Sequence, residues 1–181
     1  MVLAIIMGLM LAFDMGGPVN KVAYAFMLIC VSQGVYSVVA IAAVGIAVPP
    51  LGMGLATLIG RKYFTAEERE TGKAALVMGC VGVTEGAIPF AAADPLRVIP
   101  ANMIGAASGC VTAALMGAQC YAGWGGLIVL PVVQGKLGFV AALLVGACVS
   151  AACVILLKAF AKKKPTNVAT DDELDLDFEI N

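Results

Sequence analysis

Two long stretches of this chain, residues 22–60 and 98–134, contain no charged side chain. Each is longer than the roughly 20 helical residues that cross the hydrocarbon core of a bilayer. Across the whole sequence 61% of residues are apolar and only 13% are charged, about half the charged share of a soluble domain. Most of the surface must therefore face lipid, and the sequence predicts an integral membrane protein.

The few charges are divided unevenly along the chain. Residues 1–164 carry all 11 Lys and Arg residues against six acids, and residues 165–181 carry the other six acids. This division predicts a transmembrane part at 1–164 and a disordered, acidic cytoplasmic tail at 165–181. Apolar and acidic residues alternate within the tail, so pairing with the strand edge of a partner is a second interpretation. The expected partner is a lipid bilayer and not nucleic acid.

Length and proline content limit the first spanning segments. Residues 1–13 are apolar but too short to cross a bilayer. In the charge-free stretch that follows, Pro49 and Pro50 would interrupt helical hydrogen bonding. One spanning helix is therefore expected near residues 22–47.

Basic residues predict the direction of the last span. Residues 137–157 are a clean apolar segment followed by four lysines, so the positive-inside rule places the C-terminus in the cytoplasm. The polar segment 61–73 also carries four basic residues and is expected on the same side. There Thr65 and Glu68 form a capping box that predicts the start of a short helix. The expected fold is all-α, a multi-span bundle of about four to six hydrophobic segments.

The segment around Glu85 does not fit an ordinary spanning helix. Residues 74–84 are apolar but end at this acid, and helix-breaking and charged residues follow: Gly86, Pro89, Asp94, Pro95 and Arg97. Irregular backbone at membrane depth is tolerated where protein or a water-filled cavity satisfies its polar groups. We therefore expect a re-entrant or broken helix that lines a cavity.

Glu85 is the first candidate for a binding residue. A carboxylate inside a membrane costs at least about 2.5–3.5 kcal/mol on insertion scales, and Glu85 has no basic residue within ten positions. Ionised, it offers two acceptor oxygens for the hydroxyls of a sugar; protonated, it suits a proton relay. The residues alone leave these two roles open.

The other polar residues carry weaker signals. Asp94 and Arg97 are spaced for an ion pair that is as consistent with structure as with function, and Asp14 and Lys21 suit an interface. The six cysteines have no C-x-x-C spacing and no His residue to complete a metal site, so they are interpreted as small buried hydrophobes. No catalytic residue, metal or cofactor is assigned.

Three segments resemble the membrane-spanning C component (EIIC) of fructose-family phosphoenolpyruvate-dependent sugar phosphotransferase systems. They are AFDMGGPVNKVAYAF at 12–26, PPLGMGLATLI at 49–59 and VTEGAIPFAAADPLRVIP at 83–100. The resemblance covers residues 1–157, roughly the second half of a C component. It implies a multi-pass protein of the bacterial inner membrane that lacks the N-terminal half of the permease.

In that family the C component is a permease that binds a hexose or related sugar and presents it for phosphorylation to a phosphorylated B component. The A component, HPr and enzyme I act upstream, and the permease works as a homodimer. The resemblance implies that Glu85 contacts substrate. Positions in the matching motifs are carried over with it as substrate-binding candidates: Thr84, Asp14, Asn20, Asp94 and Arg97. No phosphoryl-carrying residue lies in this chain.

Trp124 marks a departure from the family pattern. The stretch before the last span usually reads P-H-G-G, whereas here Trp124 precedes two glycines and the chain has no His. An indole stacks on the apolar face of a sugar ring and donates one hydrogen bond, although an interfacial anchor is an equal interpretation. The replacement suggests a substrate other than fructose, such as the mannosyl glycoside mannosylglycerate.

Two other functions fit the same residues. Broken helices and membrane carboxylates also occur in proton- or ion-coupled secondary transporters. A second alternative is a truncated, nonfunctional membrane fragment, because the resemblance covers half of a permease.

Overall fold

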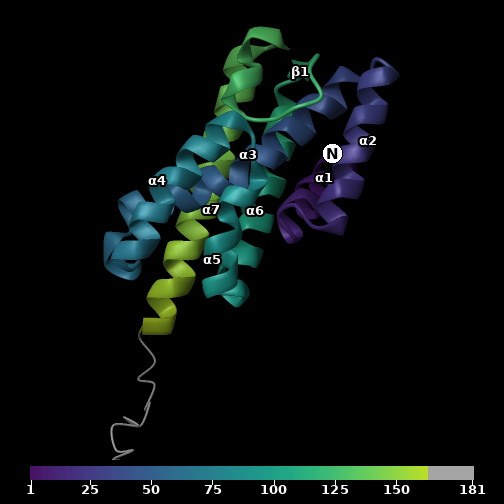
Figure 1. Ribbon diagram of the computed structural model, residues 1–181. Helices are drawn as coiled ribbons and strands as arrows, with labels where there is room; N and C mark the ends of the chain where they lie inside the picture. The colour runs from purple at the N-terminus through teal and green to yellow at the C-terminus, as the bar shows by residue number, and fades with distance from the viewer. Residues whose placement is uncertain (163–181) are drawn as a thin grey trace, which may run out of the picture.

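Residues 1–162, which this computed structural model describes, form a predominantly helical fold (Figure 1). Its α-helices are α1 (Val2–Phe13), α2 (Pro18–Ser32), α3 (Tyr36–Ile59), α4 (Ala66–Val81), α5 (Ile88–Ala93), α6 (Pro95–Leu115) and α7 (Lys136–Lys162). Short 3-10 helices lie at Arg61–Tyr63, Thr84–Ala87 and Leu127–Val132. Strands β1 (Gln119–Cys120) and β2 (Val133–Gln134) pair antiparallel between α6 and α7. The predicted all-α fold is confirmed, while the tail at 165–181 lies outside the described residues.

Helix α3 is the centre of the bundle. In its most apolar stretch of 18 residues, 83% is buried inside the bundle. The helix packs against α1, α2, α4, α6 and α7. Among the described residues, α3, α6 and α7 are long and apolar enough to cross a membrane, and α1 and α2 are shorter apolar helices. The chain is therefore an all-helical integral membrane protein, as the sequence predicted.

The expected helix at 22–47 is wrong. α2 ends at Ser32, where Gly34 takes a φ of +75° and the Val35 amide donates to the Cys30 carbonyl at 2.8 Å. This is the glycine-based ending of many helices. Conversely, α3 continues through Pro49 and Pro50, because a helix enclosed by neighbours tolerates prolines better than an isolated one.

The predicted break near Glu85 is confirmed. Helix α4 starts at the predicted capping box, in which Thr65 Oγ accepts from the Glu68 amide at 3.2 Å, and it ends at Gly82 with a φ of +88°. A 3-10 turn and α5 then lead the chain back toward the start of α4. Asp94, at the end of α5, lines one cleft together with Lys62 and Tyr63, which lie just before α4. The segment from α4 to α5 therefore forms a re-entrant hairpin with Glu85 in its tip.

Helices α6 and α7 pack closely through small residues. A Cβ atom on Gly105 would lie 2.8 Å from the Gly146 carbonyl oxygen, and one on Gly109 would lie 3.2 Å from the Gly146 Cα. Because α7 includes all of residues 137–157, the last predicted span is confirmed. The chain between these helices folds back as two short strands and a 3-10 turn.

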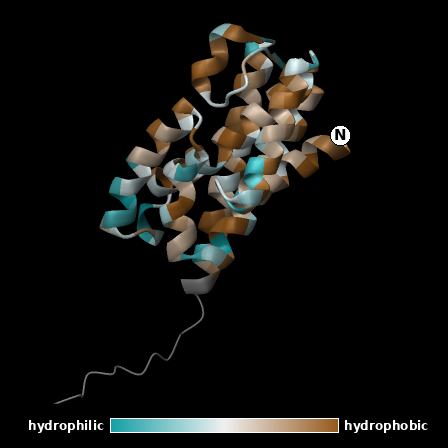
Figure 2. Cartoon of the chain, turned by 45° about the vertical axis from the view of Figure 1, so that its right-hand side comes forward, coloured by the Kyte–Doolittle hydropathy of each residue, from teal (hydrophilic) through white to brown (hydrophobic). Residues whose placement is uncertain are grey.

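Hydrophilic residues gather at the end of the molecule where α4 begins and α7 ends (Figure 2), and the charged residues of segment 61–73 are among them. Lys158 of α7 lies 2.9 Å from a Glu68 carboxylate oxygen and 4.1 Å above the Phe64 ring. Segment 61–73 and the end of α7 therefore lie at the same end of the molecule, as predicted.

Candidate functional site

A cleft of about 230 Å³ lies at the tip of the re-entrant hairpin. It brings together the hairpin tip, the start of α2, the middle of α3 and the loop after β1. The cleft is lined by Gly16, Asn20, Lys21, Tyr24, Ile46, Gly82, Thr84, Glu85 and Trp124. Four of the seven predicted site residues, Asn20, Thr84, Glu85 and Trp124, therefore share one cavity.

Glu85 presents an unpaired carboxylate to this cleft. Its side chain is exposed, and among the described residues it has no hydrogen bond or ion pair. The carboxylate lies against Gly16, where a Cβ atom would be 2.8 Å from Glu85 Oε1. Gly16 has a φ of +104°, so glycine is favoured there both by backbone conformation and by the approach of the acid. Both oxygens of Glu85 are available to a ligand.

Asp14 and Asn20 shape the turn that faces Glu85. The Asp14 carboxylate accepts from the amides of Val19 at 2.7 Å and Asn20 at 2.8 Å, in the first turn of α2. Asn20 Nδ2 donates to the Leu11 carbonyl at 2.6 Å. Asp14 is not among the residues that line the cleft. Its contacts make it a helix-capping residue, whereas Asn20 both holds the turn and lines the cavity.

Trp124 and Tyr24 form an aromatic wall. Their rings meet edge to face with centroids 6.3 Å apart, and the Tyr24 hydroxyl donates to the Gly123 carbonyl at 3.0 Å. Trp124 Nε1 donates to the Val81 carbonyl at 2.7 Å, at the end of α4. The indole N–H expected to meet a sugar is thus engaged by the backbone, and a partly exposed ring surface is left for stacking.

Two glycines fix the loop that carries Trp124. Gly82 abuts the Gly125 carbonyl so closely that a Cβ atom would clash with it. A Cβ atom on Gly125 would lie 2.7 Å from the Ala43 carbonyl oxygen of α3. The hairpin tip and the Trp124 loop therefore touch through close backbone contacts as well as through the Trp124 hydrogen bond, and these contacts hold the two sides of the cleft together.

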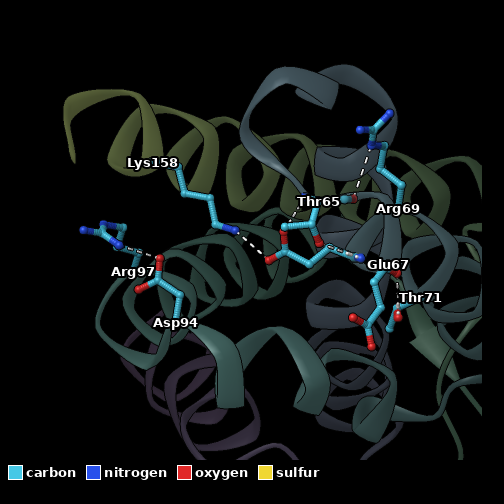
Figure 3. A network of polar contacts seen from close by, with 8 residues as sticks. Thr65, Glu67, Arg69, Thr71, Asp94, Arg97 and Lys158 are labelled. Atoms are coloured by element: carbon cyan, nitrogen blue, oxygen red, sulfur yellow. Dashed lines mark hydrogen bonds and ion pairs between the residues drawn. The ribbon is translucent and has the colours of Figure 1, made fainter. Parts of the chain in front are cut away.

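Asp94 and Arg97 lie outside this cleft. Arg97 Nη1 donates to Asp94 Oδ2 at 2.7 Å, so the predicted ion pair is formed (Figure 3). Together with Lys62, Tyr63 and Lys158 they line a separate cleft at the charged end. This ion pair lies at the base of the re-entrant hairpin, the end opposite the tip that holds Glu85.

The cysteines and acids of the described residues form no group of three that could hold a metal ion. All six cysteines are free thiols. Cys30, Cys110 and Cys120 are buried as predicted, whereas Cys148 is exposed on α7, which the sequence interpretation missed.

Lys21 and Tyr24 are cleft residues that the sequence analysis did not select. Both lie on α2 and line the cavity beside Glu85. Their spacing of three residues places them on neighbouring parts of one helix face, a signal available from the sequence once α2 is known to start at Pro18.

A membrane protein with a re-entrant hairpin, an unpaired acid and an aromatic wall in one cleft has the arrangement expected of permeases. Among known relatives, "Fructose-like permease IIC component 2" of Escherichia coli (strain K12) is 79% identical over 180 residues, 99% of this chain and 50% of that protein. "PTS system fructose-specific EIIB'BC component" of Xanthomonas campestris is 48% identical over 161 residues, 87% of the chain and 28% of that protein.

A third relative, "PTS system fructose-specific EIIC component" of Haloferax volcanii, is 38% identical over 167 residues, 92% of the chain and 44% of that protein. No family model and no solved structure matches the chain. The chain belongs to the fructose family of phosphotransferase-system C components (EIIC) and corresponds to the C-terminal half. It spans half or less of the length of these relatives.

Proposed function

We propose that the chain is the sugar-binding part of a phosphotransferase-system permease, which translocates a hexose or related sugar for phosphorylation by a partner B component. The observation that carries this proposal is the unpaired Glu85 carboxylate in a cleft with aromatic walls. Its two oxygens accept hydrogen bonds from neighbouring sugar hydroxyls, and the Trp124 ring stacks against the apolar face of the sugar. Thr84 and Asn20 contribute further polar atoms beside Glu85.

The phosphoryl group reaches the sugar from other components. The chain contains no His, and the cysteines lack a basic, exposed setting of the kind that activates a thiolate nucleophile. The names of relatives such as the EIIABC component of Bacillus subtilis join A, B and C components. We therefore place a phosphorylated B component, with the A component, HPr and enzyme I upstream, among the partners of this permease.

The intact permease contains more than this sequence. The matched relatives are two or more times its length, so another membrane half completes the transport unit, and two such units form a homodimer in this proposal. We place the assembly in the bacterial inner membrane, with the basic end of the molecule and the C-terminus in the cytoplasm. The support for this orientation is the number of basic residues near the start of α4 and the end of α7.

The substrate of the proposed permease is a fructose-like sugar or a mannosyl glycoside. The relatives carry the words fructose-like or fructose-specific in their names. Trp124, which stands where a His is usual in the family, favours a sugar recognised by stacking. Both sugar types present the vicinal hydroxyls that a carboxylate binds.

Replacement of Glu85 tests the proposed function. In the intact permease Glu85→Gln removes the charge but keeps the shape, and sugar binding measured by calorimetry should be largely abolished. Glu70→Gln is the matched control, because Glu70 lies on the surface in a pair with Lys73 at 2.7 Å. It should bind sugar like the unmodified permease. An unchanged sugar affinity in Glu85→Gln would contradict the proposal.

A further inference from the structure

Lys21 is the second charged residue of the Glu85 cleft. It lies in the first turn of α2, and its side chain is exposed. Among the described residues neither its ammonium group nor the Glu85 carboxylate takes part in an ion pair or side-chain hydrogen bond. One cavity of about 230 Å³ thus holds two opposite charges that do not meet.

Two other acids with mostly buried side chains in the described part of the chain, Asp94 and Glu68, are each paired with a base. Arg97 lies 2.7 Å from Asp94, and Lys158 lies 2.9 Å from Glu68 with both side chains largely buried. Pairing with an opposite charge lowers the cost of holding a charged side chain in a membrane protein. Two unpaired charges in one cleft are therefore better explained by a ligand that lies between them than by a structural role.

The two opposite charges of the cleft indicate which chemical groups such a ligand carries. Its hydroxyl groups donate to Glu85, and a negatively charged group accepts from the Lys21 ammonium. The volume is slightly below the 300–1,000 Å³ typical of pockets for drug-sized molecules, so it suits a monosaccharide with one substituent. The aromatic wall of Tyr24 and Trp124 lies in the same cavity.

We propose that Lys21 binds an anionic group carried by the sugar in the Glu85 cleft. This inference rests on the proposed function and adds an anion site to it. The anionic group is either the phosphate of the phosphorylated product or the carboxylate of an acidic sugar substrate. A phosphate brings about −1.5 to −2 charges, which Glu85 repels, and Lys21 offsets that repulsion.

The test compares neutral and anionic sugars in the intact permease. Binding of fructose, fructose 1-phosphate and glucuronate is measured by calorimetry in the unmodified protein and in Lys21→Gln, Lys21→Arg and Glu85→Gln. Lys21→Gln should weaken binding of an anionic sugar by about tenfold or more, as expected for loss of a charge-assisted hydrogen bond. Any loss of fructose affinity in Lys21→Gln should be clearly smaller than the loss for the anionic sugar, and Lys21→Arg should restore most of the anion binding.

The separate arms identify the source of the anion. If Lys21→Gln weakens binding of fructose 1-phosphate alone, the site binds the phosphate of the product. If Lys21→Gln weakens binding of glucuronate, the site binds the carboxylate of an acidic substrate. Equal effects of Lys21→Gln on fructose and on both anions, or no effect on either anion, would overturn the anion site. Lys73→Gln controls for the general loss of a surface lysine.

Glu85→Gln separates this inference from the proposed function. If that variant binds fructose normally, the proposed function fails whatever the Lys21 variants do. If it loses fructose binding while Lys21→Gln leaves the anions unaffected, only the anion site fails. Thermal unfolding of every variant, compared with the unmodified permease, shows whether Lys21→Arg and Lys21→Gln are equally folded.

Discussion

At the scale of single residues, the cleft depends on positions that have no side chain. Gly16 is an example, because the Glu85 carboxylate occupies the space in which a Cβ atom would stand. Gly82 has the same relation to the loop that carries Trp124. The position of the Glu85 carboxylate therefore depends on glycines, which have no side chain that could contact a ligand.

Gly16→Ala should displace Glu85 without changing its charge. The new Cβ would lie 2.8 Å from Glu85 Oε1, so the carboxylate must move and sugar binding should weaken by about tenfold. Calorimetry with the intact permease measures the change. Gly34→Ala is the matched control, because Gly34 also has a positive φ of +75° but nothing within 4 Å of its Cβ position. Equal sugar affinities for the two variants would contradict this account.

The sequence identified some of these residues and not others, for a physical reason. Glu85 stood out because a lone acid in an apolar segment is visible locally. Lys21 did not, because its significance arises from a cavity shared with residues more than sixty positions away. Asp94 and Arg97 belong to the same motif as Glu85, but the hairpin carries them to its base.

At the scale of elements, a local capping signal predicted where α4 starts, whereas apolar length and proline content did not predict where α2 and α3 end. The Thr65 capping box starts α4 as expected, since its two hydrogen bonds join residues three positions apart. Pro49 and Pro50 misled the prediction, because whether a proline ends a helix depends on the neighbours that enclose it. The true break, at Gly34, carried a weaker signal within a uniformly apolar stretch.

A buried polar pair joins α6 to α7. Ser150 Oγ donates to Asn102 Oδ1 at 2.6 Å, and both residues are fully buried. Asn102 Nδ2 also reaches Met15 Sδ at 3.9 Å, in the turn before α2. The pair therefore connects the long helices to the turn that lies beside the Glu85 cleft.

Ser150→Ala should destabilise the bundle. It leaves Asn102 Oδ1 without its donor, at a cost of about 0.6–1.7 kcal/mol, the range for hydrogen bonds between membrane helices. Thermal unfolding in detergent should show a lower midpoint than for Ser108→Ala, whose hydroxyl bonds only the Gly105 carbonyl of its own helix at 2.7 Å. Identical midpoints for the two variants would mean that the Asn102 contact contributes no stability.

At the scale of the whole molecule, polarity is arranged along its length. The charged end holds the start of α4 and the end of α7, and the β1–β2 hairpin lies at the opposite end in Figure 1. The Glu85 cleft lies between them, at the tip of a hairpin whose base is at the charged end. Such a hairpin brings a binding site into the bundle from one side of the membrane.

The positive-inside rule predicts that the charged end faces the cytoplasm, because basic residues there outnumber those of the opposite end. Ala66→Cys marks the first turn of α4, and Gln134→Cys marks β2, both at exposed positions. The parent protein carries Cys148→Ala, which removes the exposed native thiol. In inside-out vesicles a membrane-impermeant maleimide should label the Ala66→Cys protein and leave the Gln134→Cys protein unlabelled. Right-side-out vesicles should give the reverse pattern, and the Cys148→Ala parent measures the background labelling. Labelling of the Ala66→Cys protein only in right-side-out vesicles would contradict the predicted orientation.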